Sequence, residues 1–243
     1  MRARIDRDAE GRLAGLSGTS LTPIRGRNGT PLRPGHEGDA EALARLPDGR
    51  LVVAFERWHR LLAFASPEAP GLPFPGPPGL DALPANGGIE ALTALADGRL
   101  LALAEAAGED GTAPAWLGRG DGSAWEPRRY RPAPGFAAVD AAGLPGGGAL
   151  VLERRASLLS GFTSRIALLP AAALAEPVLA GRVIAELAPP LLADNFEGLA
   201  VAGRRDRALD LALVSDDNFS FLQRTLLILF RFDPLHPGAR ASP

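Results

Sequence analysis

The sequence predicts an all-β fold, a β-propeller with five or six four-stranded blades. A pattern of acidic residue, apolar run, glycine-containing turn, apolar run and acidic residue recurs about every fifty residues, as in propeller blades. Asp48-Gly49 and Asp97-Gly98 are tight-turn signals between such runs, which indicates hairpins. The Leu-rich runs are short and closely bounded by Gly and Pro, which argues against helices. A β-sandwich is the alternative, but it does not require this period.

Four copies of the pattern open at Glu41, Glu90, Asp140 and Glu197. We expect one domain over residues 1–243 with repeats at 41–89, 90–139, 140–196 and 197–243. Residues 1–40 are typical of an outer hairpin without its inner one, so the first blade is expected to be incomplete at its N-terminal side. A start codon assigned too far downstream explains this, and exchange of a terminal strand between the ends of the ring is the alternative.

The remaining strands are expected outside the inner hairpins. Candidates for outer strands are residues 60–64, 164–169 and 225–232, and the Pro-rich stretch 66–84 is a long loop or a degenerate strand. Residues 171–175 are expected to form one helical turn.

Composition narrows the classes of function. A net charge of −2 argues against nucleic-acid binding driven by bulk electrostatics. The absence of cysteine excludes disulfides, thiolate metal sites and a cysteine nucleophile. No apolar run is long enough to span a membrane, and no signal peptide is visible. We expect a monomer that acts on a small anionic or ester substrate.

The repeated acids predict a polar site. The two ends of an antiparallel hairpin lie together, so the acids that open and close each copy should meet. The expected pairs are Glu41 with Glu56, Glu90 with Glu105, Asp140 with Glu153, and Glu197 with Asp216. Eight carboxylates on one face of the propeller require compensation by arginine or by a hard cation such as Ca²⁺. The predicted metal ligands are Glu41, Glu90, Asp140, Glu197, Asn86 and Asn195.

The other predicted site residues fall into two groups. The catalytic candidates are carboxylates at the ends of the inner strands, namely Glu90, Glu197, Glu105 and Glu153. The substrate-binding candidates are Arg57, Arg154, Arg224, Asp216, Asp217 and Asn218. Arginine suits an anionic substrate because its guanidinium binds phosphate in bidentate fashion. Residues 215–220 offer four side-chain oxygen donors, and a turn held by Asx hydrogen bonds is the alternative reading of that segment.

Several segments resemble a known family. Residues 194–201 (DNFEGLAV), 213–220 (LVSDDNFS) and 223–227 (QRTLL) resemble the C-terminal signature of the bacterial phytase-like family, described as esterase-like activity of phytase. Residues 86–90, 55–57 and 152–155 match further blocks, so the resemblance runs from about Arg2 to Phe232. It implies a propeller that is usually exported, periplasmic or secreted, and an ester or phosphoester hydrolase. Members of the family normally carry a signal and an additional inner hairpin before the region that matches the start of this sequence, so the resemblance also favours a start codon assigned too far downstream.

Two functions follow. The first is a metal-assisted hydrolase of a phosphoester or another ester, in which a cation polarises the substrate and lowers the pKa of a bound water. No nucleophile is identifiable, which weighs against it. The second is a non-catalytic propeller that binds a ligand or a protein and uses acids and arginines as a salt-bridged rim. Propellers host both roles, so the fold does not choose between them.

Overall fold

The computed structural model describes residues 2–105, 107–157, 161–189, 193–221 and 223–233. Strands dominate the described residues, and the two helices among them are short 3₁₀ turns, η1 (Leu80–Ala82) and η2 (Ala171–Ala175), the second at the predicted position. Neither is long and apolar enough to cross a membrane. The all-β prediction is confirmed.

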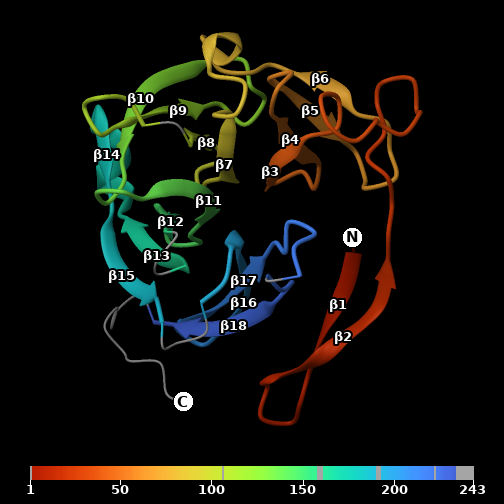
Figure 1. The fold of residues 1–243 in the computed structure, drawn as a ribbon, viewed down its shortest axis with the longest axis vertical. Helices are drawn as coiled ribbons and strands as arrows, with labels where there is room; N and C mark the ends of the chain where they lie inside the picture. Colours follow the sequence, from red (N-terminus) through yellow and green to blue (C-terminus); the bar gives the residue numbers. More distant parts are fainter. Residues whose placement is uncertain (1, 106, 158–160, 190–192, 222, 234–243) are drawn as a thin grey trace.

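Four sheets stand around a common axis as the blades of a propeller (Figure 1). Each begins with a predicted inner hairpin whose two strands lie nearest the axis. Blade 1 is β3 (Ala40–Arg45), β4 (Leu51–Phe55), β5 (Arg60–Phe64) and β6 (Leu72–Phe74). Blade 2 is β7 (Ile89–Ala94), β8 (Leu100–Ala104), β9 (Ala113–Gly118) and β10 (Trp125–Arg131). Blade 3 is β11 (Ala137–Gly143), β12 (Ala149–Ser157), β13 (Gly161–Leu169) and β15 (Arg182–Leu187).

Blade 4 has three described strands, β16 (Phe196–Arg205), β17 (Ala208–Ser215) and β18 (Leu227–Phe232). The three predicted outer strands correspond to β5, β13 and β18, and the Pro-rich stretch holds the short strand β6 together with η1. The prediction of five or six blades is wrong, because the described residues form four. The N-terminal segment that we counted as part of another blade is a separate hairpin.

That hairpin consists of β1 (Arg2–Arg7) and β2 (Leu13–Ser20), which pair only with each other among the described residues. It lies beside blade 4 (Figure 1), where Arg7 Nη2 is 3.0 Å from Asp210 Oδ2 of β17. The Asp210 side chain is largely buried, so this ion pair fixes the hairpin to the blade.

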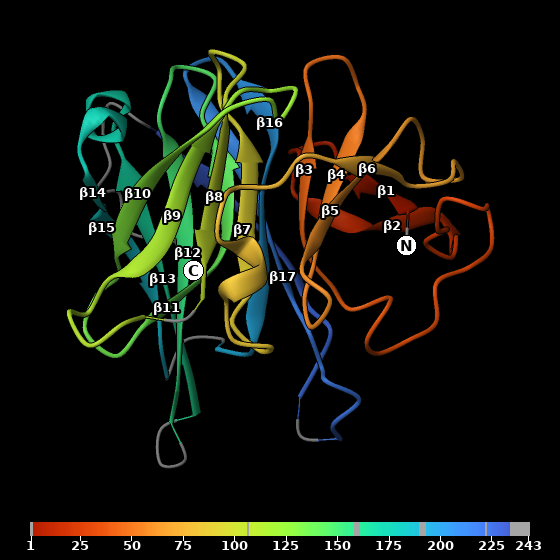
Figure 2. The same cartoon turned by 90° about the horizontal axis from the view of Figure 1, so that it is seen from above.

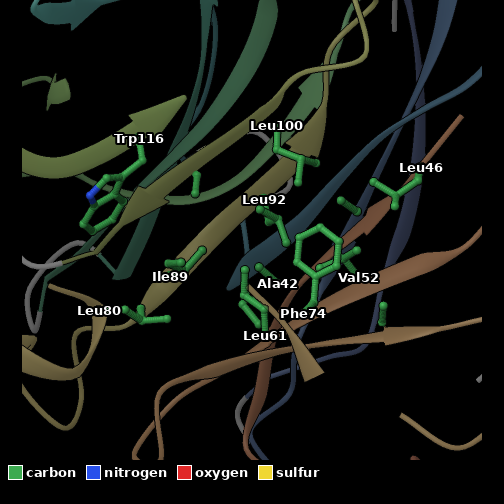
Figure 3. Packing of buried hydrophobic residues seen from close by; sticks show 14 of the residues in the cluster. Ala42, Leu46, Val52, Leu61, Phe74, Leu80, Ile89, Leu92, Leu100 and Trp116 are labelled. Atoms are coloured by element: carbon green, nitrogen blue, oxygen red, sulfur yellow. The ribbon is translucent and has the colours of Figure 1, made fainter. Parts of the chain in front are cut away.

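Apolar side chains on both faces of the inner strands pack against the neighbouring blades. One cluster joins blades 1 and 2 through residues such as Val52, Leu61, Leu92 and Leu100 (Figure 3). Similar clusters join blade 2 to blade 3 and blade 3 to blade 4. This explains why successive residues of the inner strands are apolar. In a sheet with one face in solvent, every second residue would be polar.

One connection crosses from blade to blade. Strand β14 (Val178–Ala180) follows β13 in the chain, yet it pairs in parallel with β10 and adds a fifth strand to blade 2. The backbone N–H of Arg129 also donates to the carbonyl of Pro177 at 2.9 Å. Blades 2 and 3 are therefore linked by backbone hydrogen bonds as well as by apolar packing.

Candidate functional site

The inner strands share a β-bulge at the residue that opens each repeat. The register shifts between Ala40 and Ala42 in blade 1, and the residue between them is Glu41. The same shift leaves out Glu90 in blade 2 and Glu197 in blade 4. A bulge bends the strand and redirects a side chain, which is how bulges serve functional sites. Three glutamates from three blades thus occupy one structural position.

In blade 3 the bulge lies one residue before the acidic residue, whereas in the other three blades the acidic residue itself occupies the bulge. The register shift of blade 3 lies between Ala138 and Asp140, so Val139 occupies the bulge. Asp140 is the next residue along, and a shift of one residue in a strand turns the side chain to the other face of the sheet. The expectation that Asp140 opens the third copy in the same way as Glu41 opens the first is therefore corrected.

Asp140 links two blades instead of joining the other acids. Its carboxylate accepts a hydrogen bond from the backbone N–H of Ala141 at 2.7 Å and another from that of Leu199 in β16 at 2.6 Å. Burial raises the pKa of Asp140 to about 7, although these two backbone donors act in the opposite direction. Asp140 therefore connects the inner strands of blades 3 and 4 through hydrogen bonds to the backbone.

The closing end of each hairpin shows the same offset. The last paired residues are Phe55, Ala104 and Ser215, and the residues that follow them are Glu56, Glu105 and Asp216. In blade 3 the residue that pairs just before the bulge is Glu153, opposite Ala138, and it is followed by Arg154, which pairs with Ala137. The expected pairing of Asp140 with Glu153 does not occur. Blade 3 therefore presents a cation where the other blades present carboxylates.

Glu153 points away from the other acids into the interior. It is 2% exposed and accepts a hydrogen bond from the Tyr130 hydroxyl at 2.6 Å. A second, longer hydrogen bond comes from the backbone N–H of Ala133 at 3.3 Å. The structure thus places this predicted catalytic residue in a buried contact between blades 2 and 3.

Five glutamates, which we call the glutamate cluster, lie close enough to influence one another's ionisation: Glu41, Glu56, Glu90, Glu105 and Glu197. Burial, and then the negative charge of the rest of the cluster, raises the pKa of Glu90 to about 9. Burial followed by the carboxylates of Asp39 and Glu56 raises the pKa of Glu41 to about 7. Burial also raises the pKa of Glu105, although Arg154 opposes the shift.

Three carboxylates converge tightly at one side of this cluster. Asp39, Glu41 and Glu56 each offer an oxygen, and these oxygens all lie within 4.8 Å of one another. Asp39 also pairs with Arg57, whose Nε is 2.7 Å from its Oδ2, and Glu56 Oε1 accepts a hydrogen bond from the N–H of Gly88 at 3.1 Å. An all-oxygen set of carboxylates is the donor type that Ca²⁺ and Mg²⁺ prefer.

Arg154 neutralises the other side of the cluster. Its Nη1 pairs with Glu197 Oε1 and donates to Asn195 Oδ1 at 2.5 Å. Its Nη2 lies 3.6 Å from Glu105 Oε1. The guanidinium thus bridges blades 2, 3 and 4 through their acidic positions.

The segment before β16 holds Glu197 in place. Asn195 is fully buried, and its amide nitrogen donates to Glu197 Oε1 at 3.0 Å and to the Asp216 carbonyl at 3.3 Å. Its amide oxygen is occupied by Arg154, so the geometry of this predicted metal ligand is that of a support for Glu197. Arg224, a predicted substrate-binding residue, pairs with the buried Asp194, and its Nε is 3.3 Å from Asp194 Oδ2.

The loop after β17 is organised by its own side chains. Asp216 accepts from the N–H of Asn218 at 3.0 Å, and Asp217 accepts from the N–H of Phe219 at 2.9 Å and from the Thr225 hydroxyl at 3.0 Å. These are the Asx hydrogen bonds of the alternative reading. The loop extends from the end of the blades at which the acids lie (Figure 2). Asn86 is exposed in the connection that precedes β7.

Sequence reasoning missed Asp39 as a member of the site. It lies two residues before Glu41, and regular alternation alone did not single it out. Recognition required the bulge, which brings both carboxylates toward Glu56. A local signal was available in the pair of acids separated by one alanine, which occurs at the opening of this repeat only.

Solved structures similar to this chain are distant. A protein of unknown function from Bacteroides caccae is 10% identical, with a TM-score of 0.43 over 93% of this chain and 66% of that one. One from Dyadobacter fermentans is 15% identical, with a TM-score of 0.45 over 83% and 59%. A Synechocystis apocarotenoid oxygenase is 12% identical, with a TM-score of 0.44 over 89% and 50%. The chain thus spans two thirds or less of the length of these structures.

Among curated proteins, none matches the sequence. A family model does match, over residues 1–219, which is most of the chain and includes every member of the glutamate cluster. Its description is esterase-like activity of phytase, in agreement with the resemblance carried by residues 194–201 and 213–220. The chain belongs to the phytase-like family.

Proposed function

We propose that this protein is a cation-assisted hydrolase of an ester or a phosphoester, with its active site on the acidic face of the propeller. The observation that carries the proposal is the convergence of bulge glutamates from three blades on the Asp39–Glu41–Glu56 triad. Arg154 is the only arginine bonded to the glutamate cluster among the described residues, so negative charge exceeds positive charge there. The family description supports hydrolysis of an ester bond.

The residues present fit a divalent cation. Asp39, Glu41 and Glu56 would hold it, because their oxygens already lie within 4.8 Å of one another and are hard donors. Burial, and after it the negative charge of neighbouring carboxylates, raises the pKa values of Glu41 and Glu90, and a cation would offset the second of these causes. When bound, such an ion supplies Lewis-acid polarisation of the scissile group and a more acidic water.

The chain's own residues divide the remaining work. Glu90, whose pKa is raised to about 9 by burial and by its acidic neighbours, holds a proton at neutral pH and can deliver it to the leaving oxygen. Arg154, held by Glu197 and Glu105, presents a guanidinium to an anionic substrate group. Glu153 takes no part in this scheme because it is buried against Tyr130.

Turnover by the purified chain tests the proposal. Hydrolysis of p-nitrophenyl phosphate, p-nitrophenyl acetate and phytate would be measured with Ca²⁺ and with a chelator. We expect Ca²⁺-dependent turnover of at least one of them, and a loss of about 10²-fold or more in kcat for Glu90→Gln, as for removal of a general acid. Glu176→Gln, an exposed position beside η2, is the matched control and should keep full activity. No turnover of any of the three substrates, with Ca²⁺ or with the chelator, would contradict the proposal of a hydrolase.

One observation favours a binding role instead. Phe219 and Phe221 are fully exposed on the β17–β18 loop, beside the acidic face, and exposed aromatic side chains are enriched in protein interfaces. A propeller that binds Ca²⁺ with unchanged affinity after Glu90→Gln, yet hydrolyses none of the three substrates, would fit this role.

A further inference from the structure

A cavity of about 500 Å³ lies in blade 1, outside the glutamate cluster. Its lining includes residues 58–62 at the start of β5 and Phe74 at the end of β6. Leu61 pairs with Phe74 in this sheet, so both stretches belong to the same end of the blade. Glu56 follows the last residue of β4, Phe55, which pairs with Arg60 at that end, so the cavity lies on the acidic side of the outer strands. No member of the glutamate cluster lines it.

The walls of the cavity are largely apolar and include side chains of the hydrophobic core. Leu61, Phe74 and Leu80 belong to the cluster that joins blades 1 and 2 (Figure 3), and each is at most 8% exposed. Trp58 also lines the cavity and is 53% exposed. A cavity of this size with buried apolar walls is typical of a site for a small organic ligand.

Two guanidinium groups line the same cavity. Arg60 stacks on the rings of Phe55 and Trp58, with its Cζ 4.3 and 4.6 Å from their centroids. Its hydrogen bonds go to backbone carbonyls, those of Trp58 at 2.8 Å and of Glu37, and the carboxylate of Glu37 acts on it through charge alone. Stacking and two carbonyl acceptors hold this cation in one position.

Arg27 is the second cation, and it is the more available of the two. It is exposed, and within the described ranges it makes neither an ion pair nor a side-chain hydrogen bond. Asp81 is the one carboxylate among the lining residues. The lining therefore carries one net positive charge beside apolar walls.

We propose that this cavity binds a small organic anion with an apolar aromatic body and a single carboxylate or phosphate group. The body fits between Trp58 and the Leu61–Phe74–Leu80 wall, and the anionic group meets the guanidinium of Arg27. A polyanion such as phytate is a poor match, because the cavity offers two cations and mostly apolar surface. The site is separate from the acidic centre, so it does not depend on the proposed hydrolase.

Isothermal titration calorimetry of the whole chain with 2-naphthoate tests the site, and 2-naphthylmethanol serves as the uncharged analogue. We expect saturable binding of one 2-naphthoate per chain and at least about fivefold weaker binding of the alcohol, since a charged hydrogen bond is lost. Arg27→Ala should weaken 2-naphthoate by a similar factor and leave the alcohol unchanged. Trp58→Ala should weaken the binding of both compounds. In the unaltered chain 2-naphthoate should quench tryptophan fluorescence, and the loss of this quenching in Trp58→Ala would report the same contact.

Arg33→Ala is the matched control, because Arg33 is an exposed arginine in the same connection that does not line the cavity. It should bind 2-naphthoate like the unaltered chain, as should Glu90→Gln. The proposal is overturned if 2-naphthoate does not saturate, if both analogues bind equally, or if Arg27→Ala and Arg33→Ala behave alike. Unchanged melting temperatures of the variants would show that a loss of binding is not a loss of folding.

Discussion

At the scale of single residues, Glu90 is the member of the glutamate cluster whose pKa is raised furthest. Its pKa is raised to about 9 by burial and by the surrounding glutamates, so the folded chain holds a proton that the unfolded chain releases. Glu41, with a pKa raised to about 7, behaves in the same way over a narrower range. Because the folded state holds these protons more tightly, the contribution of Glu90 and Glu41 to stability is greatest below the ordinary glutamate pKa and falls as pH rises to the raised values.

The melting temperature without divalent cations should therefore fall between pH 5 and pH 9. One retained proton is worth about 1.4 kcal/mol per pH unit, or roughly 3–5 °C for a domain of this size. The glutamine of Glu90→Gln cannot ionise, so the melting temperature of this variant should depend less on pH above pH 7. Calorimetry in cation-free buffers measures this, and identical pH slopes for both proteins would contradict the assigned shift.

Glu153 supports a second prediction at this scale, because it is buried and bonded to Tyr130. Glu153→Ala leaves the Tyr130 hydroxyl without its partner and opens a cavity, so we expect a loss of about 2–4 kcal/mol in the free energy of unfolding. Urea titration measures it. Glu126→Ala, in an exposed ion pair, should change stability by less than about 0.5 kcal/mol. A loss of activity in Glu153→Ala without a loss of stability would contradict the structural role.

At the scale of elements, the inner hairpins could be predicted from the sequence, but their exact register could not. Asp48-Gly49 and Asp97-Gly98 fix two turns, and both flanking runs became strands. In the third repeat, Asp140 and Glu153 matched the acidic pattern, yet the bulge at Val139 placed Arg154 at the site instead. A bulge depends on pairing between strands, which local residue types do not determine. Strand β14 was missed because its partner β10 lies in another blade.

Asp140 gives the prediction that belongs to this scale. It joins β11 to β16 through the Leu199 N–H, so Asp140→Ala should leave that amide unpaired and cost about 1–3 kcal/mol. Hydrogen exchange at Leu199 should become faster, while amides within β7 and β8 keep their protection. Asp121→Ala, at an exposed turn, is the control. Unchanged exchange at Leu199 would show that this hydrogen bond is not formed.

At the scale of the whole molecule, the blades serve to bring one position of the repeat together four times. The period of about fifty residues was sufficient to predict a propeller. The number of blades was overestimated, because the N-terminal hairpin β1–β2 is fixed to blade 4 by Arg7 and Asp210 rather than forming a blade of its own. Uncompensated carboxylates at the centre are costly to folding, and a cation held as we propose by Asp39, Glu41 and Glu56 would offset this cost.

The most direct test of this account is calorimetric titration of the cation-free chain with Ca²⁺ at pH 7, in two buffers of different ionisation enthalpy. We predict saturable binding accompanied by proton release, because Glu41, a member of the triad whose pKa is raised to about 7, gives up its proton when positive charge arrives. Saturation at about 100 times Kd should add about 2.7 kcal/mol to stability. Glu56→Gln should weaken binding, whereas Asp48→Asn, at the turn on the opposite end of blade 1, should not. No heat, no proton release and no stabilisation by Ca²⁺ or Mg²⁺ would contradict the account.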